Sequence, residues 1–445
     1  MTPKPALLLA ALLLGQAIAT ASAAAAPPPG RPSPSASTAE QLYAAARPKL
    51  LQIRTVVASA GRQSSLGSGF LVSSDGLAIT NYHVVSQFAL EPAAYRLEYT
   101  TVDGAHGGVK LLAIDLANDL AVVRLEKHDG PFFQFNSRAT GASLPKGEQL
   151  YSMGNPLDLG FTIVEGTYNG LVERSYNERL HFTGAVNPGM SGGPAVASDG
   201  RVVGINVAKQ VGGELVSFLV PARFAAALLA RARRSEPLSP HQIRSEIGHQ
   251  VTAWQEKLYA ALNAQGFRST SLGPYRVIES TAPWFTCWAR TTAGQVPKPR
   301  ATVDSGSCYS DTRLFIANDL STGFIQVSQS YLHSVDLNSF QFATFLSSYG
   351  FASLPGGWKQ KWYTPQRCRE DFIAVAQAEQ RLPLRVLWCA HAYREFDSLY
   401  DVVATATTQN SDSEALVVQL SLQAVSYDNA VALAKHVFEG VQWTK

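Results

Sequence analysis

The chain has 445 residues, of which 46% are hydrophobic and 16% charged, and its formal net charge is +3 at pH 7. This length accommodates two or three domains with full cores, and the composition argues against wholesale disorder. A small positive charge without a long run of Lys or Arg argues against a nucleic-acid-binding protein.

The N-terminal residues have the pattern of a secretory signal peptide. Lys4 precedes an apolar run from Ala6 to Leu14, and small residues suited to cleavage follow. The run is short for a membrane span, so an uncleaved anchor is the weaker alternative. We expect a signal peptide over residues 1–23, a Pro/Ser-rich linker over 24–39, and a mature protein in the periplasm or outside the cell, without a membrane span.

Between Gln41 and Pro221 the chain is a series of short apolar runs rich in β-branched residues, separated by turns such as Ser74-Asp75-Gly76. Many short strands at regular spacing are typical of antiparallel barrels. The stretch 76–85, GLAITNYHVV, is interpreted as one of these strands. A helix is predicted from Pro221 to Arg234, because proline favours the first helical turn.

The remainder of the chain alternates between helical and strand patterns. Residues 236–268 predict a connector helix that stops at Gly266, and residues 269–445 predict an α+β region. Its two halves, 269–355 and 356–445, each contain a cysteine pair and an apolar helix opened by Asp or Asn. A tandem repeat is therefore a hypothesis.

All four cysteines, Cys287, Cys308, Cys368 and Cys389, lie in this second half. The chain has no C-x-x-C motif, which argues against zinc, and an even number of cysteines in an exported protein favours disulfides. The intervals 287–308 and 368–389 both span 21 residues. We prefer these two pairs over the crossed connectivities, and four free thiols are the weaker alternative.

Three stretches carry residue types suited to nucleophilic catalysis. His83 lies in GLAITNYHVV, Asp119 in AIDLANDLAVVRL and Ser191 in AVNPGMSGGPAV. A serine becomes nucleophilic when a histidine removes its proton and a carboxylate orients the histidine. The chain order His, Asp, Ser is one of three known for such a triad. Each signal is weak alone, but together they indicate a serine hydrolase.

The stretches GSGFLVSSDGLAITNYHVV, NDLAVVRL and NPGMSGGPAV resemble the chymotrypsin-fold serine proteases, most closely the HtrA (Deg) branch. The resemblance covers residues 40–235 and not the C-terminal half. It implies a multidomain protein with an all-β double barrel before the α+β region. It also implies that His83 is the general base, Asp119 its orienting partner and Ser191 the nucleophile, with the N–H groups of Gly189 and Ser191 as the oxyanion hole.

Two competing interpretations of these motifs are weaker. Asp115 precedes Asp119 by four residues, but only Asp119 directly adjoins LAVVRL. GMSGG also fits the nucleophile elbow of α/β-hydrolases, which needs a strand before the serine and a helix after it. The neighbouring prolines and glycines disfavour that arrangement. Met190 departs from the family pattern, which usually has Asn or Asp before the serine.

Ala185, six positions before Ser191, occupies the place that sets the charge of the specificity pocket in trypsin-like enzymes. The absence of a carboxylate there favours a small or apolar P1 residue. Ser217, Phe218 and Leu219 are expected to pair with the substrate strand.

These observations predict an exported serine endopeptidase acting on polypeptide substrates, without a cofactor or metal. The alternative is a catalytically weak or inactive protease-like module that binds peptides in the manner of a chaperone. Association into a homo-oligomer is left open.

Overall fold

The computed structural model describes residues 36–126, 129–137, 144–209, 215–349, 361–377 and 381–444. Most of the predicted leader and linker lies outside these residues. Thr38–Lys445 form one compact unit by their contacts. None of the helices in the described ranges is long and apolar enough to cross a membrane.

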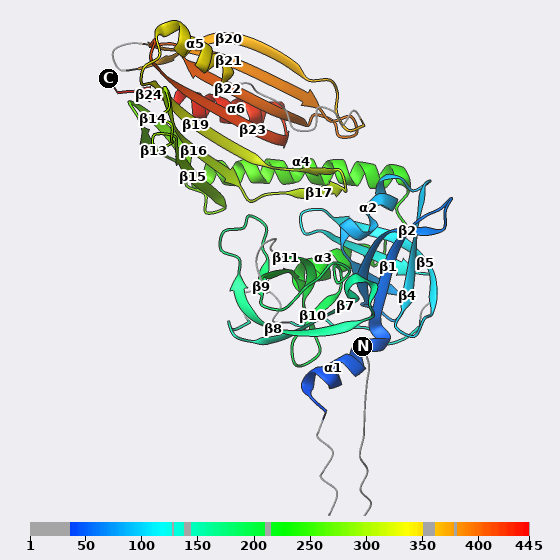
Figure 1. The fold of residues 1–445 in the computed structure, drawn as a ribbon. Helices are drawn as coiled ribbons and strands as arrows, with labels where there is room; N and C mark the ends of the chain where they lie inside the picture. The colour runs from blue at the N-terminus through cyan, green and yellow to red at the C-terminus, as the bar shows by residue number, and fades with distance from the viewer. Residues whose placement is uncertain are drawn as a thin grey trace, which may run out of the picture. The chain divides into compact units, whose positions relative to one another are not determined.

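Six strands close into a first antiparallel barrel in the order β1-β2-β3-β6-β5-β4 (Figure 1). The strands are β1 (Leu50–Val57), β2 (Arg62–Leu71), β3 (Leu77–Thr80), β4 (Tyr95–Thr101), β5 (His106–Asp115) and β6 (Leu120–Leu125). Helix α1 (Thr38–Ala46), which begins inside the predicted linker, and a 3₁₀ turn (Arg47–Lys49) precede them. The β-branched and leucine side chains of the six strands fill the barrel, because a closed sheet buries one face of every strand.

A second barrel follows in the order β10-β11-β12-β9-β8-β7. Its strands are β7 (Gln149–Gly154), β8 (Thr162–Leu171), β9 (Leu180–Phe182), β10 (Pro194–Val196), β11 (Val202–Lys209) and β12 (Ser217–Pro221), with a 3₁₀ turn (Pro156–Asp158) between β7 and β8. Helix α3 (Ala222–Ala232) closes the region. The predicted all-β double barrel is confirmed.

The secondary structure around the predicted base differs from the expectation. The stretch 76–85 is not one strand, because β3 ends at Thr80 and helix α2 (Tyr82–Leu90) begins two residues later. Asn81 is the extended N-cap of α2, and its side-chain amide donates to Asp119 O instead of continuing the strand. His83 therefore lies in the first turn of a helix. A smaller shift occurs at α3, where Pro221 is the N-cap and not the first helical residue.

The long helix α4 (Pro240–Gln265) fills most of the predicted connector. Ser239 and Gln242 form a capping box at its start, and Gly266 ends it with a φ of +79°. A glycine tolerates this left-handed conformation, which explains why the helix stops there.

The C-terminal region is built around a seven-stranded antiparallel sheet in the order β15-β16-β19-β23-β22-β21-β20. These strands are β15 (Phe285–Thr291), β16 (Ala301–Ser310), β19 (Ile325–Ser334), β20 (Arg367–Ala376), β21 (Arg381–Ala392), β22 (Tyr400–Thr408) and β23 (Glu414–Val425). Two small sheets accompany it, one of β13 (Phe267–Leu272), β14 (Tyr275–Ser280) and β24 (Gln442–Trp443), the other a hairpin of β17 (Leu314–Ala317) and β18 (Leu320–Thr322).

Alternating side chains of the sheet pack against different helices. In β23, Leu416 and Leu420 join the core that includes α6 (Tyr427–Glu439), whereas Ala415 and Val417 join the cluster that includes α5 (Ser339–Ser348). Figure 1 shows both helices beside this sheet. The period of two along a strand places these sets on opposite faces. Helices and strands in one region agree with the α+β prediction.

The disulfides join Cys287 to Cys308 and Cys368 to Cys389, the two pairs that the spacing favours. Each pair lies directly across neighbouring strands, at opposite edges of the large sheet. Asn338 caps α5, in agreement with a helix opened by Asp or Asn, whereas Ser426 caps α6. The tandem repeat stays a prediction.

One apolar cluster continues from the first barrel into the C-terminal region. It contains Val84 and Val85 of α2, Ile247 of α4 and Ile316 of β17, all fully buried. The side of the first barrel that carries α2 is therefore covered by residues far along the chain.

Candidate active site

His83 and Asp119 form a hydrogen-bonded pair at the edge of the first barrel. Nδ1 of His83 lies 2.6 Å from Oδ2 of Asp119, and the His83 backbone N–H donates to Oδ1 over 2.9 Å. The His83 side chain is 28% exposed and that of Asp119 15%. This arrangement fixes one nitrogen of the imidazole and leaves Nε2 for another partner.

The backbone around Asp119 explains how its carboxylate reaches α2. Asp119 adopts a φ of +56°, and its carbonyl accepts from the Tyr82 N–H (3.2 Å) and from the Asn81 side-chain amide (2.7 Å). The left-handed conformation is uncommon outside glycine and marks a locally enforced turn. Asp115 instead accepts from the backbone and side chain of Asn118, so it is not the partner of His83.

The surroundings of His83 act on its pKa in opposite directions. Burial alone would lower the pKa of the imidazole, but the negative charge of Asp119 and its hydrogen bond outweigh burial and raise it above the ordinary value. The Arg179 guanidinium of the second barrel also lies close to Asp119. Its Nη2 donates to Ala117 O over 3.2 Å, and its charge interacts with those of Asp119 and Asp115.

The loop that carries Ser191 has two backbone N–H groups, those of Gly189 and Ser191, without a partner among the described residues. The Pro188 carbonyl accepts from the Leu157 N–H over 2.8 Å, and Gly189 has a φ of +95°. Because the N–H and C=O of a trans peptide point in opposite directions, the Gly189 N–H faces away from Leu157. Among the described residues, neither the Gly189 N–H nor the Ser191 N–H donates a hydrogen bond to the protein.

Glycines let this loop touch the first barrel with its main chain. A Cβ on Gly192 would collide with Ser68 O and lie 2.8 Å from Asn81 N, two residues before His83. A Cβ on Gly193 would collide with Met153 O. The loop thus brings Ser191 beside the segment that leads into α2. The described hydrogen bonds do not include one between the Ser191 hydroxyl and His83, so this last link of the triad stays a prediction.

Ser68 of β2 is a residue of the site that the sequence analysis missed. It is fully buried, its N–H donates to Ser191 O over 2.7 Å, and its hydroxyl donates to Gly189 O over 2.7 Å. The same hydroxyl accepts from the Asn155 N–H of the second barrel. The signal in the sequence was a polar residue between two glycines in GSGF, a composition that suits close backbone approach.

Met190 is held in place by burial of its side chain in an apolar core. It is fully buried in the core of the second barrel, in one cluster with Val186 and Leu219. Its N–H donates to Asn187 O over 3.0 Å, and its carbonyl accepts from the Asn206 side chain. The departure from the family pattern therefore has an apolar anchor in this chain.

The residues predicted to bind substrate are placed differently from one another. Ser217 donates to Gly184 O over 2.8 Å and accepts from the Val186 N–H, so it supports the segment that contains half-buried Ala185. The expectation that 217–219 pair with a substrate strand is wrong for this structure. β12 already pairs with β11 on one side and β9 on the other, and the Leu219 side chain is fully buried.

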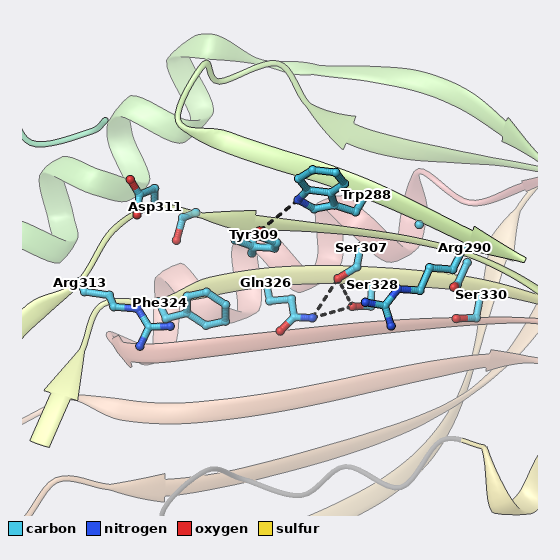
Figure 2. A pocket seen from close by; sticks show the side chains of 13 residues that line it. Trp288, Arg290, Ser307, Tyr309, Asp311, Arg313, Phe324, Gln326, Ser328 and Ser330 are labelled. Atoms are coloured by element: carbon cyan, nitrogen blue, oxygen red, sulfur yellow. Dashed lines mark hydrogen bonds between the residues drawn. The ribbon is translucent and has the colours of Figure 1, made fainter. Parts of the chain in front are cut away.

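A cavity of about 810 Å³ lies on the large C-terminal sheet, away from these residues (Figure 2). Its floor is a network in which Gln326 donates to the hydroxyls of Ser307 and Ser328, and Trp288 donates to the Tyr309 hydroxyl. The described residues that line it include neither histidine nor cysteine. Within the described ranges no group of three or more His, Cys, Asp or Glu side chains could hold a metal ion.

We expect Met190→Asn to destabilise the protein, although asparagine is common at this position in the family that the chain resembles. The amide would enter an apolar core without partners, at a cost of about 2–4 kcal/mol in the free energy of unfolding. Urea denaturation measures this loss. Met190→Leu is the matched control and should cost under about 1.5 kcal/mol, and equal stability of the two variants would contradict the buried anchor.

Comparisons with known proteins match part of the chain. Residues 67–205 match the family model of the trypsin-like peptidase domain. A protein of Chlamydia muridarum named "Probable periplasmic serine endoprotease DegP-like" is 32% identical over 172 residues, which are 37% of this chain and 33% of that protein. A protein of Rhizobium meliloti with the same name is 34% identical over 171 residues, 37% of this chain and 32% of that protein.

The chain thus spans about a third of the length of these relatives. Among solved structures, the serine endoprotease from Yersinia pestis matches with a TM-score of 0.38 and 25% identity, covering 45% of this chain and 68% of that one. The family match, residues 67–205, lies within the part of the chain that forms the two closed barrels. Residues 67–205 are therefore similar to trypsin-like peptidase domains, and part of the chain is similar to the DegP-like serine endoproteases.

Proposed function

We propose that the protein is a serine endopeptidase in which His83 is the general base, Asp119 orients it and Ser191 is the nucleophile. The observation that carries this proposal is the imidazole whose Nδ1 is held by a carboxylate at 2.6 Å, beside a loop with two unused amide donors. A base needs one fixed nitrogen and one free nitrogen, and a transition state that becomes an oxyanion needs such donors.

The proposed reaction is acyl transfer in two steps. Nε2 of His83 takes the proton of the Ser191 hydroxyl while Oγ attacks the peptide carbonyl, and the negative oxygen accepts from the N–H groups of Gly189 and Ser191. The imidazolium, stabilised by Asp119, then protonates the leaving amine. Water, deprotonated by the same nitrogen, hydrolyses the acyl-enzyme.

The substrate would be a polypeptide with a small or apolar P1 residue, since Ala185 supplies no charge. Because β12 has no free edge, we propose that the substrate strand pairs with β11, at the residues that follow Asn206. The Asn206 carbonyl accepts from the Gly192 N–H, and the Asn206 N–H donates to Gly193 O. In the described part of the chain, the following Ala208 and Lys209 pair only with β12. An open strand edge that continues from the nucleophile loop suits β-strand addition.

Export is part of the proposal and is supported by the leader-like N-terminus and by the relatives named as periplasmic. The alternative, a protease-like module that binds peptides without turnover, would use the same strand edge. The two unused amide donors of Gly189 and Ser191 favour the enzyme, because a module that only binds has no need of them.

An alkyl fluorophosphonate, which reacts with activated serines, tests the nucleophile. We expect full-length protein to be labelled at Ser191 and to cleave casein, because Nε2 of His83 is free to take the hydroxyl proton. Ser191→Ala should abolish both, and His83→Ala should slow labelling strongly. Folded wild-type protein that takes no label and leaves casein intact would favour the binding module.

Asp119→Asn should lower the rate of labelling by about 10⁴-fold, because the amide disturbs the tautomer and orientation of the imidazole. The remaining activity should have its acidic limb at lower pH. The neutral imidazole is the active form, so activity is lost as pH falls through its pKa, and removing the Asp119 charge leaves burial to lower that pKa. A limb that stays in place or moves to higher pH would contradict this account.

Ser68→Ala should lower the labelling rate between about 10- and 100-fold, less than the loss of a whole oxyanion donor, because the loop loses the hydroxyl that holds Gly189 O. It should also cost about 1–3 kcal/mol in unfolding free energy, since Gly189 O and Asn155 N–H lose their partner. Ser65→Ala, on the same strand, is the control and should resemble the wild type. A fast and stable Ser68→Ala variant would show that the loop holds itself.

A further inference from the structure

The β17–β18 hairpin of the C-terminal region lies against the first turn of α2. The Tyr82 hydroxyl donates to Ile316 O over 3.0 Å, and the Tyr82 side chain is fully buried. Leu314 and Ile316 point into the apolar cluster that also contains Val84, whereas Phe315 between them is only half-buried. Phe315 packs against the edge of the same cluster, where its ring contacts those of Tyr82 and His83.

Phe315 meets the ring of the proposed base. Its ring centroid lies 6.0 Å from that of His83 with an interplanar angle of 74°, and 6.4 Å from that of Tyr82 at 70°. Both are edge-to-face arrangements within the range of favourable aromatic pairs. The imidazole is thus held by Asp119 through Nδ1 and by an aromatic side chain that the peptidase domain does not itself supply.

The C-terminal region fixes the hairpin in place from the other end. Trp362 Nε1 donates to Asp319 in the hairpin turn over 2.9 Å. The Tyr393 hydroxyl lies 2.6 Å from the Thr322 hydroxyl and donates to the buried Asp401 over 2.7 Å. Because the single Tyr393 proton goes to Asp401, the Thr322 hydroxyl donates to Tyr393. Asp319 and Thr322 of the hairpin are therefore held by hydrogen bonds to residues of the C-terminal region.

We propose that Phe315 is a positioning residue that holds the His83 imidazole in the orientation for proton transfer, so that the C-terminal region completes the active site. This inference rests on the proposed peptidase function. Holding the base matters in the transition state more than in substrate binding, so Phe315 acts on the chemical step. A hairpin that only fills space over α2 would affect stability and not that step.

The test measures the inactivation of full-length protein by an alkyl fluorophosphonate, separating the maximal rate from the half-saturating concentration. Phe315→Ala should lower the maximal rate by about 2- to 10-fold, the range of one aromatic pair, and leave the half-saturating concentration within about twofold. Phe315→Tyr keeps the ring and should restore the rate. Ser321→Ala, which is exposed and directly across the hairpin from Phe315, is the control and should resemble the wild type.

Phe315→Leu keeps apolar volume without the ring, and decides the question if Phe315→Ala fails to fold. A Leu variant that melts at the wild-type temperature and reacts more slowly supports the proposal. Equal rates in the wild type and the folded Leu variant overturn it, as does a slower rate that Phe315→Tyr does not restore. Wild-type protein that takes no label instead refutes the proposed function, and the role of Phe315 falls with it.

Discussion

The contact between the main chain of the Ser191 loop and strand β2 is the constraint on which the proposed site depends. Ser68 binds the carbonyls of Ser191 and Gly189 from one barrel, and its hydroxyl accepts the Asn155 N–H from the other. Backbone can approach backbone this closely only where side chains are absent, and a Cβ on Gly192 would collide with Ser68 O. Gly193 makes the equivalent close approach to Met153 O of β7, in the second barrel. The proposed oxyanion donors, the N–H groups of Gly189 and Ser191, therefore lie in a loop that contacts from both barrels hold in place.

The proposed base, His83, is likewise held by contacts from outside its own segment. His83 is not held by its own helix alone, because the Asp119 turn reaches α2 through three hydrogen bonds, to the Asn81 side chain and to the main chain of Tyr82 and His83. Asp119 accepts an uncommon left-handed φ to make them. A strained turn persists only where surrounding contacts hold it in place. At Asp119 these contacts are the hydrogen bonds to the residues at the start of α2.

The sequence was informative where local chemistry specifies structure. The strand pattern, the Gly266 helix stop and the paired cysteine intervals correctly indicated the barrels, α4 and the disulfides. It was misleading where tertiary contacts decide. The apolar run into His83 resembles a strand but becomes a helix because Asn81 bonds to a loop far along the chain. Similarly, nothing in the sequence indicates that β9 pairs with β12, and for this reason the sequence alone predicts that residues 217–219 pair with substrate.

The C-terminal region was beyond the reach of sequence reasoning for a physical reason. Nothing in LFIA, the sequence of β17, indicates that Ile316 O will accept from Tyr82 or that Phe315 will meet His83. Such a contact depends on where a whole sheet is placed. Because the buried face of α2 shares one apolar cluster with α4 and β17, cutting the chain after the barrels would expose Tyr82 and Val84 to water. In this protein the boundary of the peptidase domain along the sequence is therefore not the boundary of its folding core.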